Sequence, residues 1–112
     1  MKNVDEMSLE QKLMELQQCL SKAKVGAENP GSTDYEFLLN SKLGDQRDEK
    51  LAYYTTVLTN SKQLIGGRLN QLDYDVRQNA IRDINNKLND ALLAFPGYGK
   101  TEELNQSQGL GR

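Results

Sequence analysis

The sequence predicts an all-α protein: a small antiparallel helical bundle, or a helical hairpin with a long C-terminal helix pair, and no sheet. Leucines recur every three or four residues near the N-terminus, and apolar residues keep a period near 3.6 through the second half. No stretch alternates apolar and polar residues for long enough to predict a sheet. The length of 112 residues suits one domain, which we place at 8–95 between flexible ends at 1–7 and 96–112.

The first helix is predicted to begin at Ser8. Ser8-Leu9-Glu10-Gln11 is a capping-box pattern, in which the Ser hydroxyl and the Gln side chain satisfy free backbone amides. Apolar residues then follow one narrow stripe: Leu9, Leu13, Leu16, Leu20 and Ala23. Gly26 and the turn sequence Asn29-Pro30-Gly31-Ser32 are expected to end this helix and to redirect the chain.

Two further helices are expected between Thr33 and Ile65. A second capping box, Thr33-Asp34-Tyr35-Glu36, predicts a short helix that Gly44 closes. Asp45 and Asp48 precede another helical stretch, where negative charge favours the positive end of the helix dipole. Its apolar face carries Leu51, Tyr54, Leu58 and Ile65.

Gly66 and Gly67 form the predicted hinge. Each Gly inside a helix costs about 1 kcal/mol relative to Ala, whereas a turn uses the positive backbone angles that Gly allows. A helix running through 46–94 would be a rod of about 75 Å. We predict the hairpin instead, with the last helix over 69–95 and a stop at Pro96.

Composition excludes several functions. The net charge of −2 disfavours nucleic-acid binding, and the absence of His removes imidazole catalysis and His-ligated metals. Cys19 is the sole cysteine, so no disulfide forms within the chain, and we expect a buried, inert thiol. The acidic start and the lack of any long apolar run predict a cytoplasmic protein without a membrane segment.

Two short motifs resemble ligand-binding sites, and we interpret both as helix ends without a ligand. Ala94–Thr101 fits a loose phosphate-binding loop, but a helix precedes it instead of a strand. Asp45, Asp48 and Glu49 could approach a hard cation, yet they equally suit a helix start. We therefore expect no catalytic residue, cofactor, metal or small-molecule substrate, and the chain is predicted not to be an enzyme.

The polar faces of the helices are rich in amides and mixed charge. Asn and Gln together number 19, and amides within a helical seam can fix register and oligomer number, although we favour an ordinary solvent-facing surface. Arg and Lys alternate with Asp along the last helix, which indicates a solvated or paired face. Tyr53 and Tyr54 could offer rings to a partner, but we favour a core position for both.

One local pattern in the first half of the chain resembles a segment of a known protein family. Asn29-Pro30 followed by Leu38-Leu39-Asn40-Ser41-Lys42-Leu43 resembles the turn and second-helix start of type III secretion needle subunits. Needle subunits end after their second helix, whereas this chain continues into another long amphipathic helix, so we do not assign it to that family. The resemblance implies only that a helix, a proline turn and a helix suit a packing subunit.

These observations predict a protein that acts through its surface. We expect a self-associating subunit or adaptor of a larger assembly, with coiled-coil-like packing between copies or with a protein partner. The alternative is a small partner-specific binder, such as a chaperone or an inhibitor that docks a helix on its target. The predicted interaction face consists of Leu9, Leu13, Leu16, Leu20, Leu72, Val76, Ile84 and Leu88.

Overall fold

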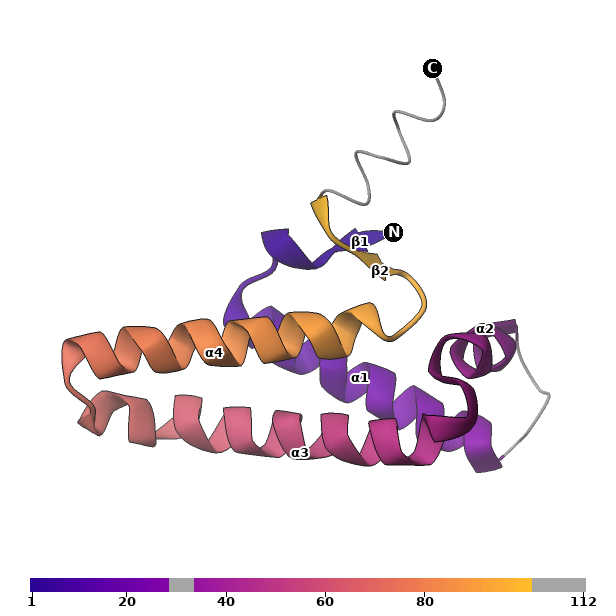
Figure 1. The fold of residues 1–112 in the computed structure, drawn as a ribbon, viewed down its shortest axis with the longest axis horizontal. Coiled ribbons are helices and arrows are strands. Elements are labelled where there is room, and N and C mark those ends of the chain that lie inside the picture. Colours follow the sequence, from indigo (N-terminus) through magenta and orange to yellow (C-terminus); the bar gives the residue numbers. More distant parts are fainter. Residues whose placement is uncertain (29–33, 102–112) are drawn as a thin grey trace, which may run out of the picture.

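Four α-helices make up most of the chain in the computed structural model, which describes residues 1–28 and 34–101 (Figure 1). Two very short strands and three 3-10 helical turns, labelled η, complete the described part. The elements in chain order are β1 Lys2–Asn3, η1 Val4–Glu6, α1 Leu9–Glu28, α2 Asp34–Leu43, η2 Gly44–Gln46, α3 Arg47–Gly66, η3 Arg68–Gln71, α4 Tyr74–Leu93 and β2 Tyr98–Gly99. The predicted all-α class is confirmed.

Capping residues lie at the predicted start of the first helix and at the predicted end of the second. The prediction that Gly26 ends the first helix was wrong, because α1 continues through Gly26 to Glu28 and a single glycine costs a helix only about 1 kcal/mol. The backbone N–H of Gln11 donates a hydrogen bond of 3.1 Å to Oγ of Ser8, as the first capping box predicts. Gly44 follows α2 with φ +65°, a conformation that favours Gly over residues with a Cβ. The predicted turn at 29–32 and the first residue of the second capping box lie outside the described residues.

Helices α3 and α4 form the predicted antiparallel hairpin, and α1 crosses both (Figure 1). The turn lies where α3 ends at Gly66, but the conformational reason given for it was wrong. Neither glycine has a positive φ; Gly67 is extended, with φ −172°. The reversal is made instead by η3 and by the extended backbone of Leu72 and Asp73.

The last helix is shorter than the predicted 69–95. It begins at Tyr74, because Leu72 and Asp73 are extended and the carbonyl of Asp73 accepts the first helical hydrogen bond, from Arg77 N–H at 2.8 Å. The apolar periodicity continues N-terminal of Tyr74 and therefore predicted a helix start that is too early. Leu69 in η3 is buried and Leu72 is partly buried, so the turn itself continues the apolar pattern of the helix.

The two ends of the described chain pair with each other, which corrects two predictions. β1 and β2 form a parallel ladder with Lys2 opposite Tyr98 and Asn3 opposite Gly99, although no sheet was expected. Val4 is 0% exposed, so the 1–7 segment is part of the folded unit and is not a free end. The predicted tail at 96–112 likewise contributes β2, while its residues 102–112 lie outside the described part. Strands of two residues carry no periodic signal.

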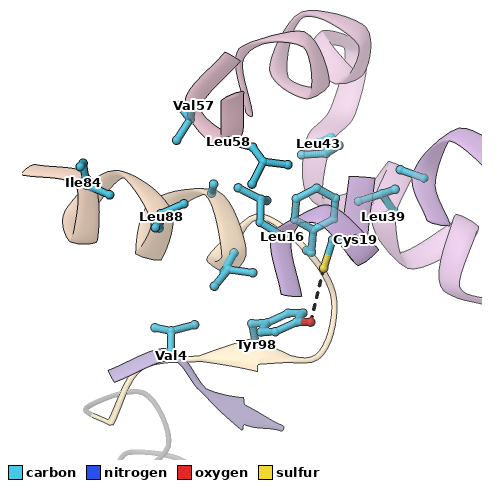
Figure 2. Close-up of a cluster of buried hydrophobic side chains, with 14 of the residues drawn as sticks. Val4, Leu16, Cys19, Leu39, Leu43, Val57, Leu58, Ile84, Leu88 and Tyr98 are labelled. Carbon is cyan, nitrogen blue, oxygen red and sulfur yellow. Dashed lines mark hydrogen bonds between the residues drawn. The ribbon is translucent and has the colours of Figure 1, made fainter. Parts of the chain in front are cut away.

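The core lies where α1 crosses the hairpin (Figure 2). Leu16 of α1, Leu58 of α3 and Leu88 of α4 belong to one buried cluster, and Val4 and Tyr98 lie on the strand side of it. The largest fully buried side chains are Phe95, Leu16, Leu39, Leu88, Leu92 and Val4. Burying a side chain of this size contributes about 1.5–3 kcal/mol, so the crossing point of the three helices supplies much of the hydrophobic stabilisation.

Candidate functional site

The predicted interaction face belongs largely to this core, so most of its residues are not available to a partner. Three of its members are buried: Leu16, Ile84 and Leu88. Four are partly buried against the core: Leu9, Leu13, Leu20 and Leu72. Val76 alone of the eight is exposed, at 52%. The reason is that α3 and α4 of the same chain cover the apolar stripe of α1, which leaves little of that stripe for a partner.

A different apolar feature is exposed on α2. Phe37 is 72% exposed and Leu38 is 50% exposed, while Leu39 and Leu43 on the same helix are buried in the core. Successive residues of a helix point about 100° apart, so three apolar residues in a row cannot all share one buried face. We call Phe37 and Leu38 the α2 ridge. The run Phe37-Leu38-Leu39 is the sequence signal for this exposed pair, which the predicted interaction face does not include.

Polar anchors hold α2 against the bundle. The guanidinium of Arg47 donates to the carboxylate of Glu36 and to Oδ1 of Asn40, and its Nη2 donates to the carbonyl oxygen of Ala23 at 3.0 Å. Both Glu36 and the Arg47 side chain are largely removed from solvent. Three partners on two helices therefore fix the position of α2 relative to α1 and α3.

A second anchor joins α2 to the end of α4. Lys42 Nζ donates to the carbonyl oxygens of Leu93 at 3.0 Å and of Phe95 at 3.3 Å. Carbonyls at a helix C-terminus lack partners within the helix, and a cation there also suits the helix dipole. The α2 ridge therefore lies on a helix that is held in place at two successive turns, through Glu36 and through Lys42.

A groove of about 480 Å³ runs between α1 and α3. Its apolar lining includes Leu20, Ala23, Leu51, Ala52 and Leu58. Its charged lining, among the described residues, is Lys24, Arg47 and Lys62 against Asp48. Two hydrogen bonds connect the helices on either side of the groove. One runs from Arg47 to the carbonyl oxygen of Ala23, and the other runs from Lys62 Nζ to Oε1 of Gln17. We call this feature the α1/α3 groove; it is apolar inside and mainly cationic around it.

A smaller cavity of about 240 Å³ lies beside Cys19. The Cys19 thiol donates to the Tyr98 hydroxyl at 3.4 Å, which donates to Oε2 of Glu15 at 3.1 Å (Figure 2 shows the first bond). Lys2 Nζ pairs with the other oxygen of Glu15. Burial raises the pKa of the Cys19 thiol, and the hydrogen bond to Tyr98 offsets only part of this rise. The thiol therefore stays protonated near neutral pH and is a poor nucleophile.

The hydroxyl of Tyr35 also faces buried surroundings near this cavity. Its Oη makes no well-formed hydrogen bond among the described residues, although the Cys19 thiol lies close to it, and burial together with this thiol raises the pKa of Tyr35. Lys22 Nζ stands 4.0 Å above the Tyr35 ring, a cation–π arrangement that leaves the ammonium at the surface. The cavity thus holds protonated hydroxyls and a protonated thiol, a set that binds by hydrogen bonding and does not supply a nucleophile.

Residues 94–101 do not form a phosphate-binding loop. Gly97, with φ +95°, ends the turn after Phe95, and Tyr98–Gly99 is a strand. The backbone N–H of Thr101 donates to Oδ2 of Asp5 at 3.2 Å. A carboxylate therefore occupies the donor that a phosphate would need, and it would repel that phosphate.

Other sequence candidates are dispersed. No group of three or more acidic or cysteine side chains in 1–24 and 34–101 is arranged to hold a metal ion, and Asp45, Asp48 and Glu49 are exposed. Tyr53 is 56% exposed, against the core position expected for it, whereas Tyr54 is partly buried and its ring lies 6.0 Å from that of Phe95. None of the helices in the described part is both long and apolar enough to cross a bilayer.

Buried charges were not foreseen from the sequence. Lys12, Glu15 and Glu36 are each less than a tenth exposed. Lys12 Nζ donates to Oδ1 of Asn85 on α4, and burial lowers its pKa while the nearby Asp5 carboxylate opposes this change. The apolar stripe of α1 did not predict the burial of Lys12, because a buried Lys and a solvated Lys cannot be told apart from sequence.

Comparisons of this chain with protein-family models, with curated proteins and with solved structures found no match. The fold and the surface therefore carry the functional argument. They define a small all-α bundle with an anchored apolar ridge and a separate groove.

Proposed function

We propose that this chain is a non-enzymatic helical subunit that acts by protein–protein interaction and associates with copies of itself. The observation that carries the proposal is the α2 ridge. Two adjacent large apolar side chains are exposed on a helix that Arg47 and Lys42 hold in place. Single exposed apolar residues are ordinary, whereas a pair on a rigid element suits a contact that needs little ordering on binding.

The polar chemistry of the chain supports the same proposal. Its buried thiol has a raised pKa, and its buried carboxylates accept hydrogen bonds from Lys2, Tyr98 and Arg47. These groups tie elements of the bundle together, so they serve structure and are not poised for catalysis. The absence of an enzymatic activity and the cytoplasmic location expected above both stay predictions.

Mass by light scattering across a concentration series tests the proposal. We expect the mass to rise above the 12.6 kDa of one chain as concentration increases. The double variant Phe37→Ser/Leu38→Ser should stay monomeric, because it removes the apolar contact without touching the core. Val76→Ser, which changes an exposed apolar residue on another helix, is the matched control and should behave as the unmodified chain does. A mass of one chain at every concentration would contradict self-association.

The second candidate is a partner-specific binder, and the α1/α3 groove favours it. An apolar groove with cationic side chains around it suits an acidic amphipathic helix of another protein. A monomeric chain that gains thermal stability when such a peptide is added, and loses that gain in Ala52→Arg, would favour this reading over self-association.

A further inference from the structure

We propose that the α2 ridge of one copy docks in the α1/α3 groove of a second copy. The inference rests on the proposed self-association and adds which two surfaces meet. Each copy then uses one surface to insert and a different one to receive, which makes the contact heterologous. Such contacts build rings when the rotation between copies closes and open filaments when it does not.

Apolar complementarity is the first argument. The groove offers Leu20 and Leu51, both only partly buried, and Ala52 beside them. The ridge offers Phe37 and Leu38, which the fold of their own chain leaves uncovered. Docking removes both apolar surfaces from water, and each buried methylene group adds to the affinity.

The occupant must come from another copy. The buried residues of α2, Leu39 and Leu43, already face the core of their own chain. Phe37 and Leu38 point to the solvent side of the same helix, and the anchors at Arg47 and Lys42 keep it in that orientation. The ridge of a chain therefore does not fill the groove of that same chain.

Charge complementarity is the second argument. Asp34 lies one turn before the ridge, on the same side of α2. Lys42, four residues after Leu38, donates to the carbonyl oxygens of Leu93 and Phe95 instead. The groove brings Lys24 and Lys62, and neither forms an ion pair within the described residues. The groove lining also includes the carboxylate of Asp48, but its cations Lys24, Arg47 and Lys62 outnumber this anion. Asp34 beside the ridge thus complements a mainly cationic groove, which favours docking of ridge in groove over ridge against ridge.

Cross-linking between two differently tagged copies tests the contact. One copy carries Leu38→Cys on the ridge and the other carries Ala52→Cys in the groove, and the two are mixed under mild oxidation. We expect a disulfide between the two copies. The matched control replaces Leu38→Cys with Tyr74→Cys, an exposed position on α4 that should give at least tenfold less cross-linked product. Cys19 is buried, and the unmodified chain measures its background.

Mass measurements separate the inference from the proposed function. Ala52→Arg should raise the dissociation constant of self-association about tenfold or more by filling the groove, as Phe37→Ser/Leu38→Ser does by removing the ridge. If the chain self-associates but neither variant changes its mass and no cross-link forms, the ridge-in-groove contact is wrong and self-association stands. If the unmodified chain is monomeric throughout, both fail together.

Discussion

The hydroxyl of Tyr98 donates a hydrogen bond of 3.1 Å to Oε2 of Glu15, across 83 positions of sequence. The bond ties β2 to the middle of α1. Lys2 of β1 pairs with the other carboxylate oxygen, so both ends of the described chain converge on one buried acid. Because a buried carboxylate needs such donors, the strand pair and the helix α1 depend on each other for stability.

Removing this donor should destabilise the fold. Tyr98→Phe leaves one oxygen of Glu15 and the thiol of Cys19 without the hydroxyl that each contacts. We expect the free energy of unfolding, measured by urea denaturation, to fall by about 1–3 kcal/mol. Tyr53→Phe, on an exposed ring, should change it by less than about 0.5 kcal/mol. Equal effects of the two substitutions would show that the Tyr98 hydroxyl contributes nothing specific.

Alkaline pH should destabilise the protein. Burial raises the pKa values of Cys19, Tyr35, Tyr54 and Tyr98 in the folded state. Above the unfolded values of about 8.5 for Cys and 10 for Tyr, the unfolded chain releases these protons while the folded chain keeps them. The stabilisation is complete below those values and is lost as pH rises, by about 1.4 kcal/mol per pH unit for each such proton.

Denaturation at a series of pH values from neutral to alkaline measures this loss. Burial lowers the pKa of Lys12, so this residue binds one proton fewer in the folded chain and makes the free energy of unfolding rise with pH. The total decrease of this free energy per pH unit is therefore smaller than the sum over the four acidic groups. Tyr98→Phe should make the slope shallower. A free energy of unfolding that does not fall with alkaline pH would contradict the buried, protonated state of these groups.

The N-terminal segment should contribute directly to stability. Val4→Ala removes two methyl groups from a wholly buried side chain, and we expect a loss of about 2 kcal/mol in chemical denaturation. Val76→Ala makes the same chemical change at a position that is 52% exposed, and its effect should stay within about 0.5 kcal/mol. A negligible effect at Val4 would return the 1–7 segment to the flexible end first predicted.

Two glycines should respond in opposite directions to the same substitution. Gly66 is helical without a positive φ, and a Cβ there meets open space, so Gly66→Ala should stabilise the protein by about 0.4–1 kcal/mol. Gly97 has φ +95°, and Gly97→Ala should cost about 1–2 kcal/mol from backbone strain. Melting temperatures of the two variants report the difference. A destabilised or domain-swapped Gly66→Ala would instead indicate that the hinge needs the freedom of glycine.

The Arg47 anchor should matter more than a surface ion pair. Arg47→Met leaves the largely buried Glu36 without its guanidinium partner, and we expect a loss of about 3 kcal/mol in the free energy of unfolding. Lys87→Met breaks the exposed pair between Lys87 and Asp83, 3.0 Å apart on α4, and should cost about 0.3–0.5 kcal/mol. Similar losses for both would mean that the Arg47 contacts add nothing beyond ordinary surface electrostatics.

Local signals in the sequence determined the helices. The capping serine at Ser8, the glycine at Gly44 and the pair Gly66-Gly67 stand where helices begin or end, because capping and helix propensity act within a few residues of chain. The period of apolar residues gave the all-α class for the same reason. It overran the true start of α4, since the buried Leu69 lies in a turn and not in the helix.

Only the tertiary structure decided which apolar residues remain for a partner. The apolar stripe on α1 looks like an interface in the sequence, but α3 and α4 of the same chain bury its Leu16. Phe37 on α2, by contrast, stays exposed. The strand pair and the contact between Glu15 and Tyr98 are likewise invisible in sequence. Burial depends on contacts between residues far apart in the chain, and periodicity reports only that a face is apolar, not what covers it.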